Sequence, residues 1–200
     1  QEWYEKHVTN RPEGKLAEKK FSNGKSDRKQ WEKYKSILRK SDVPKTFSEF
    51  QELKYENPEA YRLMKVDYKR RIKLQQHPEL SLPNAKAATA ANAKFTDYIF
   101  NPLNKSGFAK GVAFDMRLGY NANNWMDLKN EILSRASDYP STFKGSISKN
   151  GNVYGDKYEQ QIIVYGSKGK PANVLVGWIM ENGNPRMTTA LIKEMKDPWK

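Results

Sequence analysis

The stretch Val153–Ile192 decides the fold of this chain. It contains three runs, which read Val153-Tyr-Gly-Asp-Lys-Tyr-Glu-Gln-Gln-Ile-Ile-Val-Tyr165, Ala172-Asn-Val-Leu-Val-Gly-Trp-Ile-Met180 and Arg186-Met-Thr-Thr-Ala-Leu-Ile192. Each run is rich in Val, Ile, Thr, Tyr and Trp, which strands favour, and short segments built on Gly and Asn join them. The pattern predicts a three-stranded antiparallel meander.

Alternation along the middle run separates its side chains into two faces. Val174, Val176 and Trp178 share an apolar face that belongs on a core, whereas Asn173, Leu175 and Gly177 share a mixed face that suits a concave, partly open surface. In the last run, strict alternation displays either Thr188 or Thr189 and turns the other inward. The sequence leaves open which of the two is displayed.

The chain is strongly basic. Its 200 residues carry a formal net charge of +13, of which +8 falls on residues 1–90 and +5 on residues 91–200. Such a field attracts polyanions, and nucleic acid is the commonest of them. A basic surface without a specific partner is the alternative that charge alone leaves open.

The residue types that are missing narrow the chemistry. The chain has no Cys and only two histidines, His7 and His77, both in its first half. A disulfide framework, a thiolate zinc site and, in the second half, an HNH nuclease or a Ser-His-Asp triad are therefore excluded. No run approaches the roughly 20 apolar residues that cross a bilayer. No signal peptide is visible, and the start at Gln1 leads us to expect a fragment or a processed product.

Helical patterns fill the first half. Trp31, Tyr34 and Leu38 form an apolar stripe on a helix over 27–40, which Asp27 can cap. Thr46 and Glu49 have the spacing of a capping box, and Pro58 suits the first position of a helix over 58–76. The alanine-rich segment 83–92 has no large apolar residue, so we place a domain boundary there. The expected division is an arm or linker (1–26), a basic helical segment (27–82), a linker (83–92) and a second domain (93–200).

Three further helices precede the strands in the second domain. They are expected over 94–100, 108–118 and 125–136, with Phe108, Val112 and Met116 among the inner positions of the second one. We interpret 141–152 as a polar loop that leads into the meander. Helices followed by strands are typical of the α+β class, so the prediction is about three helices packed on a three-stranded antiparallel sheet.

Several segments resemble a known type of domain. These are Lys94-Phe-Thr-Asp-Tyr-Ile-Phe-Asn-Pro102, Gly107-Phe-Ala-Lys-Gly111, Tyr154-Gly-Asp-Lys-Tyr158, and Val176-Gly-Trp178 with Thr188-Thr-Ala190. They are similar to the C-terminal domain of Mu F-type phage minor head proteins and of bacterial polymorphic toxins. The basic helical half resembles the segment in front of that domain in prophage proteins. By fold analogy, the order of elements also resembles the barnase–EndoU–colicin–RelE class of ribonucleases.

The resemblance implies metal-free cleavage of RNA, in which the ribose 2′-hydroxyl attacks the adjacent phosphate. Such chemistry needs a proton acceptor, a proton donor and cations around the phosphate. The catalytic candidates are Lys110, Tyr154, Tyr158, Thr188 and Thr189. Lys110 would be the cation at the phosphate, although a solvated helix lysine is the plainer interpretation, as cross-strand packing is for the tyrosines and β propensity for the threonines. The candidates for nucleic-acid binding are Lys157, Arg186, Lys65, Lys69, Arg70, Arg71 and Lys73.

The sequence therefore predicts a nuclease-type toxin carried by a phage or prophage head-associated protein, without cofactor or metal. It would be virion-associated or delivered into the bacterial cytoplasm, with RNA as substrate, an immunity protein and a phage capsid as implied partners, and no membrane contact. The alternative is a non-enzymatic minor capsid or ejection protein that binds DNA through the basic helices. A third interpretation, an adaptor without a nucleic-acid role, depends only on the edge of the meander as a pairing surface.

Overall fold

The protein consists of two compact units, 1–62 and 63–200. The structure, a computed structural model, describes residues 12–167 and 170–195, apart from the side chain of Val153. The division falls inside α5 (Pro58–Gln76) and not in the segment 83–92, where the sequence placed it. Part of the expected arm, residues 1–11, lies outside the described residues.

Unit 1 is helical. It contains α2 (Pro12–Ser22), α3 (Gly24–Ile37), α4 (Phe47–Glu56) and the start of α5. The capping box predicted at Thr46 and Glu49 is confirmed, with both reciprocal hydrogen bonds present. The expectation of an arm over 12–26 is wrong, because α2 and the first turn of α3 occupy these residues.

A buried carboxylate organises unit 1. Asp27 does not precede its helix as a cap but lies in the first turn of α3 with no exposed surface. Burial alone would raise its pKa, yet hydrogen bonds from Lys54, Tyr55 and Gln51 outweigh burial and hold the pKa of Asp27 below its ordinary value. Lys54 Nζ and Tyr55 Oη each lie 2.7 Å from this carboxylate. The polar network fixes α4 against α3.

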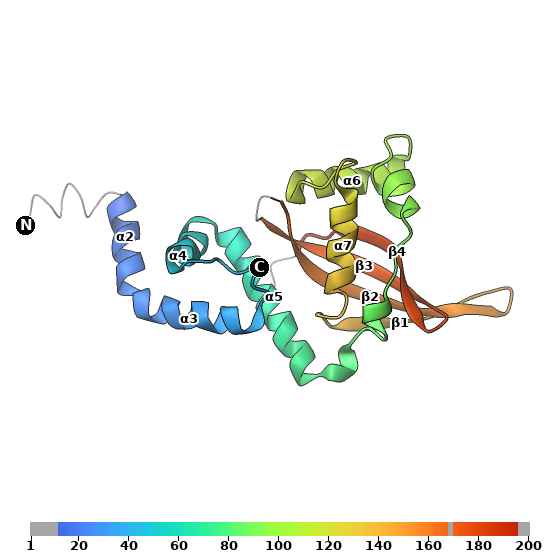
Figure 1. Cartoon of the computed structure of the whole chain (residues 1–200), viewed down its shortest axis with the longest axis horizontal. Helices are drawn as coiled ribbons and strands as arrows, with labels where there is room; N and C mark the ends of the chain where they lie inside the picture. Colours follow the sequence, from blue (N-terminus) through green and yellow to red (C-terminus); the bar gives the residue numbers. More distant parts are fainter. Residues whose placement is uncertain (1–11, 168–169, 196–200) are drawn as a thin grey trace, which may run out of the picture. The chain divides into compact units, whose positions relative to one another are not determined.

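Unit 2 is built on an antiparallel sheet of four strands in the order β1-β2-β3-β4 (Figure 1). The strands are β1 (Ser141–Lys149), β2 (Asn152–Tyr165), β3 (Pro171–Glu181) and β4 (Asn184–Ile192). The α+β class is confirmed. The expected number of strands is wrong, because the segment interpreted as a polar loop, 141–152, forms β1 and a tight turn.

The two outer hairpins use the same turn chemistry. Asn150 and Gly151 join β1 to β2 with φ values of 53° and 79°, and Asn182 and Gly183 join β3 to β4 with 53° and 80°. Positive φ at both central residues is the geometry that Asn-Gly turns provide, because it matches the twist of the flanking strands. β1 escaped prediction because nearly all of its side chains are exposed, so it lacks the alternation of a half-buried strand.

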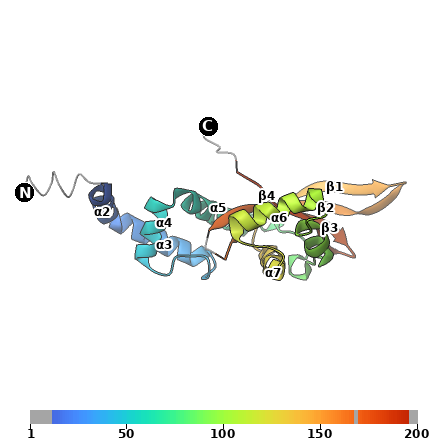
Figure 2. The same ribbon diagram turned by 90° about the horizontal axis from the view of Figure 1, so that it is seen from above.

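Helices pack on one face of this sheet and along its β4 edge. They are η2 (Pro78–Leu80), η3 (Ala85–Ala87), the π-helical turn η4 (Lys94–Ile99), α6 (Lys105–Leu118) and α7 (Trp125–Arg135). α7 crosses the sheet in Figure 1, and α6 packs against β4 and β3 (Figure 2). The core between these layers contains Trp178, Phe95 and Ile132, each fully buried.

Residues 83–92 belong to this unit. Ala85 and Ala90 are buried in its core, and Thr89 joins β4 through hydrogen bonds with Pro185 O and from Met187 N. Alanines can be buried where two backbones approach closely, so the lack of large apolar residues does not make this segment a linker.

α6 packs through a different face from the one predicted. Phe108, Val112 and Met116 are exposed, Met116 to 81%, whereas Phe114 and Leu118 are buried with two glycines, Gly107 and Gly111. The glycine side of the helix faces η4, and this close contact positions the candidate site.

Candidate functional site

Lys110 lies at the centre of a polar cluster on unit 2. Its Nζ donates hydrogen bonds to Tyr98 Oη at 3.2 Å and to Thr189 Oγ1 at 3.1 Å. Tyr98 Oη also lies 3.1 Å from Ser106 Oγ. We call Tyr98, Ser106, Lys110 and Thr189 the Lys110 cluster. It joins η4, α6 and β4, so it exists only in the folded domain.

Two glycines bring α6 onto η4. A Cβ atom at Gly107 would lie 2.1 Å from Tyr98 O, and one at Gly111 would lie 2.0 Å from Ile99 O. No side chain fits at such distances. Asn104 starts the helix here, because its side chain accepts a hydrogen bond from Gly107 N. The spacing Gly107-x-x-x-Gly111 thus places Lys110 beside the Tyr98 phenol.

An extra residue in β4 brings both threonines to the same side of the sheet. Gly177 pairs with Thr189, but the next residue of β3, Trp178, pairs with Met187, so Thr188 is inserted as a β-bulge. A Cβ at Gly177 would lie 2.8 Å from Thr188 Oγ1 and 3.0 Å from Thr189 Cγ2. Strict alternation was therefore the wrong assumption. Both threonines are partly exposed, and Thr189 contacts Lys110.

The electrostatics of the cluster favour the ionised form of one phenol. The hydrogen bond with Ser106, followed by the hydrogen bond and charge of Lys110, holds the pKa of Tyr98 below its ordinary value of 10.0. Desolvation opposes this effect and is the smaller influence. Because of this lowered pKa, the Tyr98 phenol becomes a proton acceptor at a lower pH than a free tyrosine does.

This cluster falls within a recognised domain. Residues 81–194 match the model of a family described as a domain of unknown function, DUF6883. The chain belongs to the DUF6883 family. No curated protein and no solved structure shows significant similarity to it. All four members of the Lys110 cluster lie inside the DUF6883 domain, whereas α5 precedes it.

The two predicted catalytic tyrosines do not join the cluster. Tyr158 pairs with Trp178 on the helix-covered face of the sheet and packs against Phe143, with ring centroids 5.4 Å apart. Thr189 and Gly177 lie on the opposite face. Tyr154 is 58% exposed on the β1–β2 hairpin, beyond the pairing of β2 with β3. The DUF6883 domain therefore brings together Lys110 and Thr189, but neither tyrosine.

Tyr98 and Ser106 are the members that sequence reasoning missed. Both lie next to the glycine pair, Tyr98 at the backbone that Gly107 touches and Ser106 as its neighbour in the chain. Two glycines four apart in a helix indicate a close backbone approach, and polar side chains beside that contact would have been the signal to follow.

Of the two predicted cations on the strands of the DUF6883 domain, one forms an ion pair and the other is partly buried. Arg186 Nε forms an ion pair with Glu181 Oε2 at 2.6 Å. Lys157 pairs with Ile179 across the sheet and is partly buried.

Arg71 is not a surface cation, as the sequence had suggested. Its guanidinium is buried and donates to Asp67 Oδ1 at 2.8 Å, to Asp138 Oδ2 at 3.1 Å and to Tyr139 Oη at 3.0 Å. The carboxylate of Asp67 is fully buried and also accepts from Tyr139 and Tyr165. The buried ion pair of Arg71 with Asp67 therefore stabilises the packing of α5 on the sheet, and Arg71 is not a surface group for nucleic acid.

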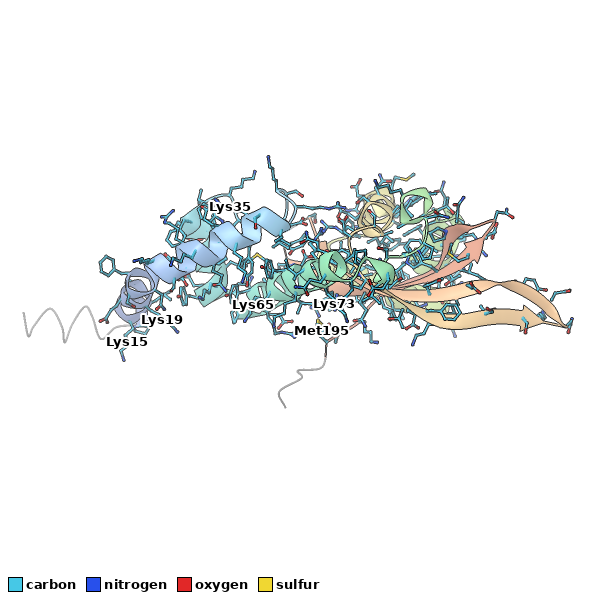
Figure 3. All side chains as sticks on the ribbon, turned by 90° about the horizontal axis from the view of Figure 1, so that it is seen from below. Lys15, Lys19, Lys35, Lys65, Lys73 and Met195 are labelled. Carbon is cyan, nitrogen blue, oxygen red and sulfur yellow. The ribbon has the colours of Figure 1, made fainter. Side chains whose placement is uncertain are left out.

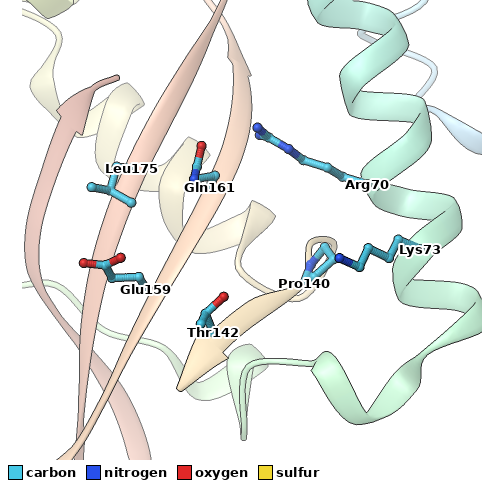
Figure 4. Close-up of a pocket in the computed structure, with 7 residues that line it drawn as sticks. All are labelled: Arg70, Lys73, Pro140, Thr142, Glu159, Gln161 and Leu175. Atoms are coloured by element: carbon cyan, nitrogen blue, oxygen red, sulfur yellow. The ribbon is translucent and has the colours of Figure 1, made fainter. Parts of the chain in front are cut away.

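The other predicted cations of α5 differ in exposure. Lys65 and Lys73 lie along the helix in Figure 3, where Lys65 is partly buried and Lys73 exposed. Lys69 is exposed as well. Arg70 and Lys73 line a pocket of about 190 Å³ on the sheet face that carries Thr189 (Figure 4). The Arg70 pocket consists of Arg70, Lys73, Pro140, Thr142, Glu159, Gln161 and Leu175.

One row of the sheet connects the Arg70 pocket with the Lys110 cluster. Thr142 pairs with Glu159, Glu159 with Gly177, and Gly177 with Thr189, so these residues cross all four strands on one face. β2 and β4 are two strand spacings apart, about 10 Å. The pocket and the cluster therefore belong to one continuous surface.

Within the described part of the chain, no group of three or more His, Asp or Glu side chains gathers in a way that could hold a metal ion. Over the same residues, no helix has both the length and the apolar composition needed to cross a membrane.

Proposed function

We propose that this protein is a metal-independent ribonuclease of the toxin type, with the Lys110 cluster as its active site. The observation that carries the proposal is the pair of hydrogen bonds from Lys110 Nζ, one to the Tyr98 phenol and one to the Thr189 hydroxyl. A phenol of lowered pKa, an ammonium and a hydroxyl can supply the proton acceptor, the proton donor and the charge stabilisation that cleavage of RNA without a metal needs.

Each group has a role in the reaction. The Tyr98 oxygen, as phenolate, takes the proton of the ribose 2′-hydroxyl while O2′ forms a bond to phosphorus. Lys110 and Thr189 stabilise the charge that develops on the phosphoryl oxygens. The bond from phosphorus to O5′ then breaks, and Lys110 supplies the proton that the leaving oxygen needs. The products are a 2′,3′-cyclic phosphate and a 5′-hydroxyl, so atoms and protons balance.

The charge of unit 2 supports a polyanionic substrate. Residues 63–200 contain 21 Lys and Arg against 12 Asp and Glu. The sheet face beside Thr189 is partly open, with Glu159, Gln161 and Leu175 all partly exposed. A cationic, accessible surface attracts RNA and lets a single strand approach the cluster.

The experiment uses the full chain and total bacterial RNA. Wild-type protein should cleave it equally well with and without EDTA and leave 2′,3′-cyclic phosphate ends, and its expression should arrest bacterial growth. Lys110→Ala and Tyr98→Phe should each slow cleavage about a hundredfold or more and relieve the growth arrest, whereas Lys105→Ala, which removes an exposed lysine of the same helix, should change neither effect. Folded wild-type protein that leaves RNA intact and growth unaffected would refute the proposal.

A second function, binding of DNA by a phage head-associated protein, is favoured by the surface of unit 1. Exposed cations recur along α2 and α3, namely Lys15, Lys19, Lys25, Lys29 and Lys33. Duplex DNA should then bind the chain with an affinity that falls steeply as salt rises. Absence of binding at low salt would dispose of this function. Both proposed functions imply a phage or prophage origin. The DNA-binding function implies a phage capsid as partner, and the toxin function implies an immunity protein.

A further inference from the structure

The guanidinium of Arg70 is hydrogen-bonded to no carboxylate among the described residues, although the charge of Asp67, which pairs with Arg71, favours its ionised form. Burial lowers its pKa below the ordinary value, so the guanidinium has lost much of its water. Its hydrogen bonds go to neutral groups, from Nη1 to Asn173 Oδ1 at 2.7 Å and from Nη2 to Met195 Sδ at 3.7 Å. Among the described residues it forms no ion pair. A desolvated cation without a carboxylate partner is costly unless an anion joins it.

The guanidinium is nevertheless held in a fixed orientation. Asn173 Nδ2 donates in turn to Gln161 Oε1 at 2.9 Å and to Lys193 O at 3.0 Å. Because Gln161 accepts through its oxygen, its amide N–H groups are left for the pocket. Two of the five N–H groups of Arg70 have partners in this network, and the others remain. Figure 4 shows Arg70 reaching from α5 toward Gln161 on the sheet.

The remaining lining adds donors and positive charge. Lys73 is exposed, its ammonium group forms no ion pair or hydrogen bond among the described residues, and Thr142 adds a hydroxyl. Glu159 is the one carboxylate of the lining, and Lys144 Nζ lies 3.5 Å from its Oε2 and offsets its charge. The volume of about 190 Å³ is below that of a pocket for a drug-sized ligand and suits a small anion.

We propose that the Arg70 pocket binds a backbone phosphate of a single-stranded nucleic acid that lies across the sheet from the Lys110 cluster. This inference deepens the proposed function, since it makes the substrate a single strand that reaches from β4 to α5. The planar fork of Arg70 fits two phosphate oxygens, and Lys73 contributes a second charge. The shared row Thr142–Glu159–Gly177–Thr189 provides the path between the two sites.

Binding is measured by the fluorescence anisotropy of a labelled 2′-O-methyl RNA hexanucleotide mixed with the full chain. This probe lacks the attacking hydroxyl, so its affinity is independent of cleavage. Arg70→Met and Lys73→Ala should each weaken binding at least fivefold and reduce the slope of log affinity against log salt by about 0.7. Lys86→Ala removes an exposed charge of unit 2 outside the pocket and should change the affinity less than twofold.

Lys73→Ala keeps the test decisive if Arg70→Met fails to fold, because the Lys73 ammonium group forms no hydrogen bond or ion pair within the described residues and its loss leaves no partner unpaired. Equal effects of Lys73→Ala and Lys86→Ala would overturn the inference. So would a nucleoside monophosphate that binds wild type as tightly as the hexanucleotide. Lys73-dependent binding by a protein that cleaves no RNA would refute the proposed function alone. Cleavage with Lys73-independent binding would refute the pocket alone.

Discussion

Lys110 Nζ donates a hydrogen bond to Thr189 Oγ1 across 3.1 Å, although the two residues lie 79 positions apart in the chain. The contact connects α6 with β4 and makes the ammonium part of the sheet surface. The two groups should therefore act as one unit on the transferred phosphoryl group.

A double-mutant cycle tests this coupling. Lys110→Ala should reduce kcat/KM for RNA cleavage by about 10²–10³-fold, the usual effect of removing a group that stabilises transition-state charge. Thr189→Val should reduce it about tenfold, and the double variant should be no worse than Lys110→Ala, since groups that act together are not additive. Independent, multiplicative losses would contradict a shared role. Lys105→Ala serves as the control.

Tyr98 should produce a pH dependence on the basic side of neutrality. Because Ser106 and Lys110 lower its pKa, the phenolate becomes populated at a lower pH than in a free tyrosine. Cleavage by wild type should rise with pH and level off below pH 10. Tyr98→Phe should remove this limb of the profile of kcat/KM, and Ser106→Ala should shift it to higher pH. An unchanged limb in Tyr98→Phe would assign the proton transfer to another group.

Gly111→Ala should destabilise the domain and disorder the site together. The new Cβ would lie 2.0 Å from Ile99 O and 3.0 Å from Phe100 Cδ1, so α6 has to move away from η4. Overpacking of this kind costs about 1–3 kcal/mol. Urea unfolding measures the loss. Gly24→Ala, where no atom lies within 4 Å of the new Cβ, should leave stability the same or slightly higher.

Arg71 and Lys73 lie two residues apart on α5, but their substitution should affect the free energy of unfolding very differently. Arg71→Ala leaves the buried Asp67 carboxylate without its ion pair, which costs about 3–5 kcal/mol in the free energy of unfolding. Lys73→Ala should change stability by no more than about 0.5 kcal/mol. Chemical denaturation distinguishes them. A stable Arg71→Ala protein with weakened RNA binding would return Arg71 to the binding surface.

The sequence predicted the elements whose signals are local. The capping box of Thr46 and Glu49, Pro58 at the start of α5 and the apolar face with Trp178 all depend on residues close in the chain, and the structure has them where expected. Lys110 and Thr189 were also among the catalytic residues that the sequence predicted, and the structure joins them by a hydrogen bond.

The errors share a different cause, since each depends on a partner distant in the chain. β1 is an edge strand with exposed side chains, so only its pairing with β2 identifies it. The inner face of α6 is determined by the close approach of η4 to Gly107 and Gly111. The spacing of apolar residues within α6 gives no sign of this contact. Arg71 resembles its cationic neighbours in sequence, and only Asp67 and Tyr139 make it a structural residue.

The bulge at Thr188 adds a second hydroxyl to the open face of the sheet without altering the core. Deleting this one residue would restore regular alternation in β4 and leave Ala190 and Leu191 with their present partners in β3. Thr189 would keep Gly177 as its partner, and the hydrophobic layer beneath the helices would survive, but the Thr188 hydroxyl beside Gly177 would be lost. A single codon therefore adds or removes one hydroxyl on the open face while the scaffold stays the same.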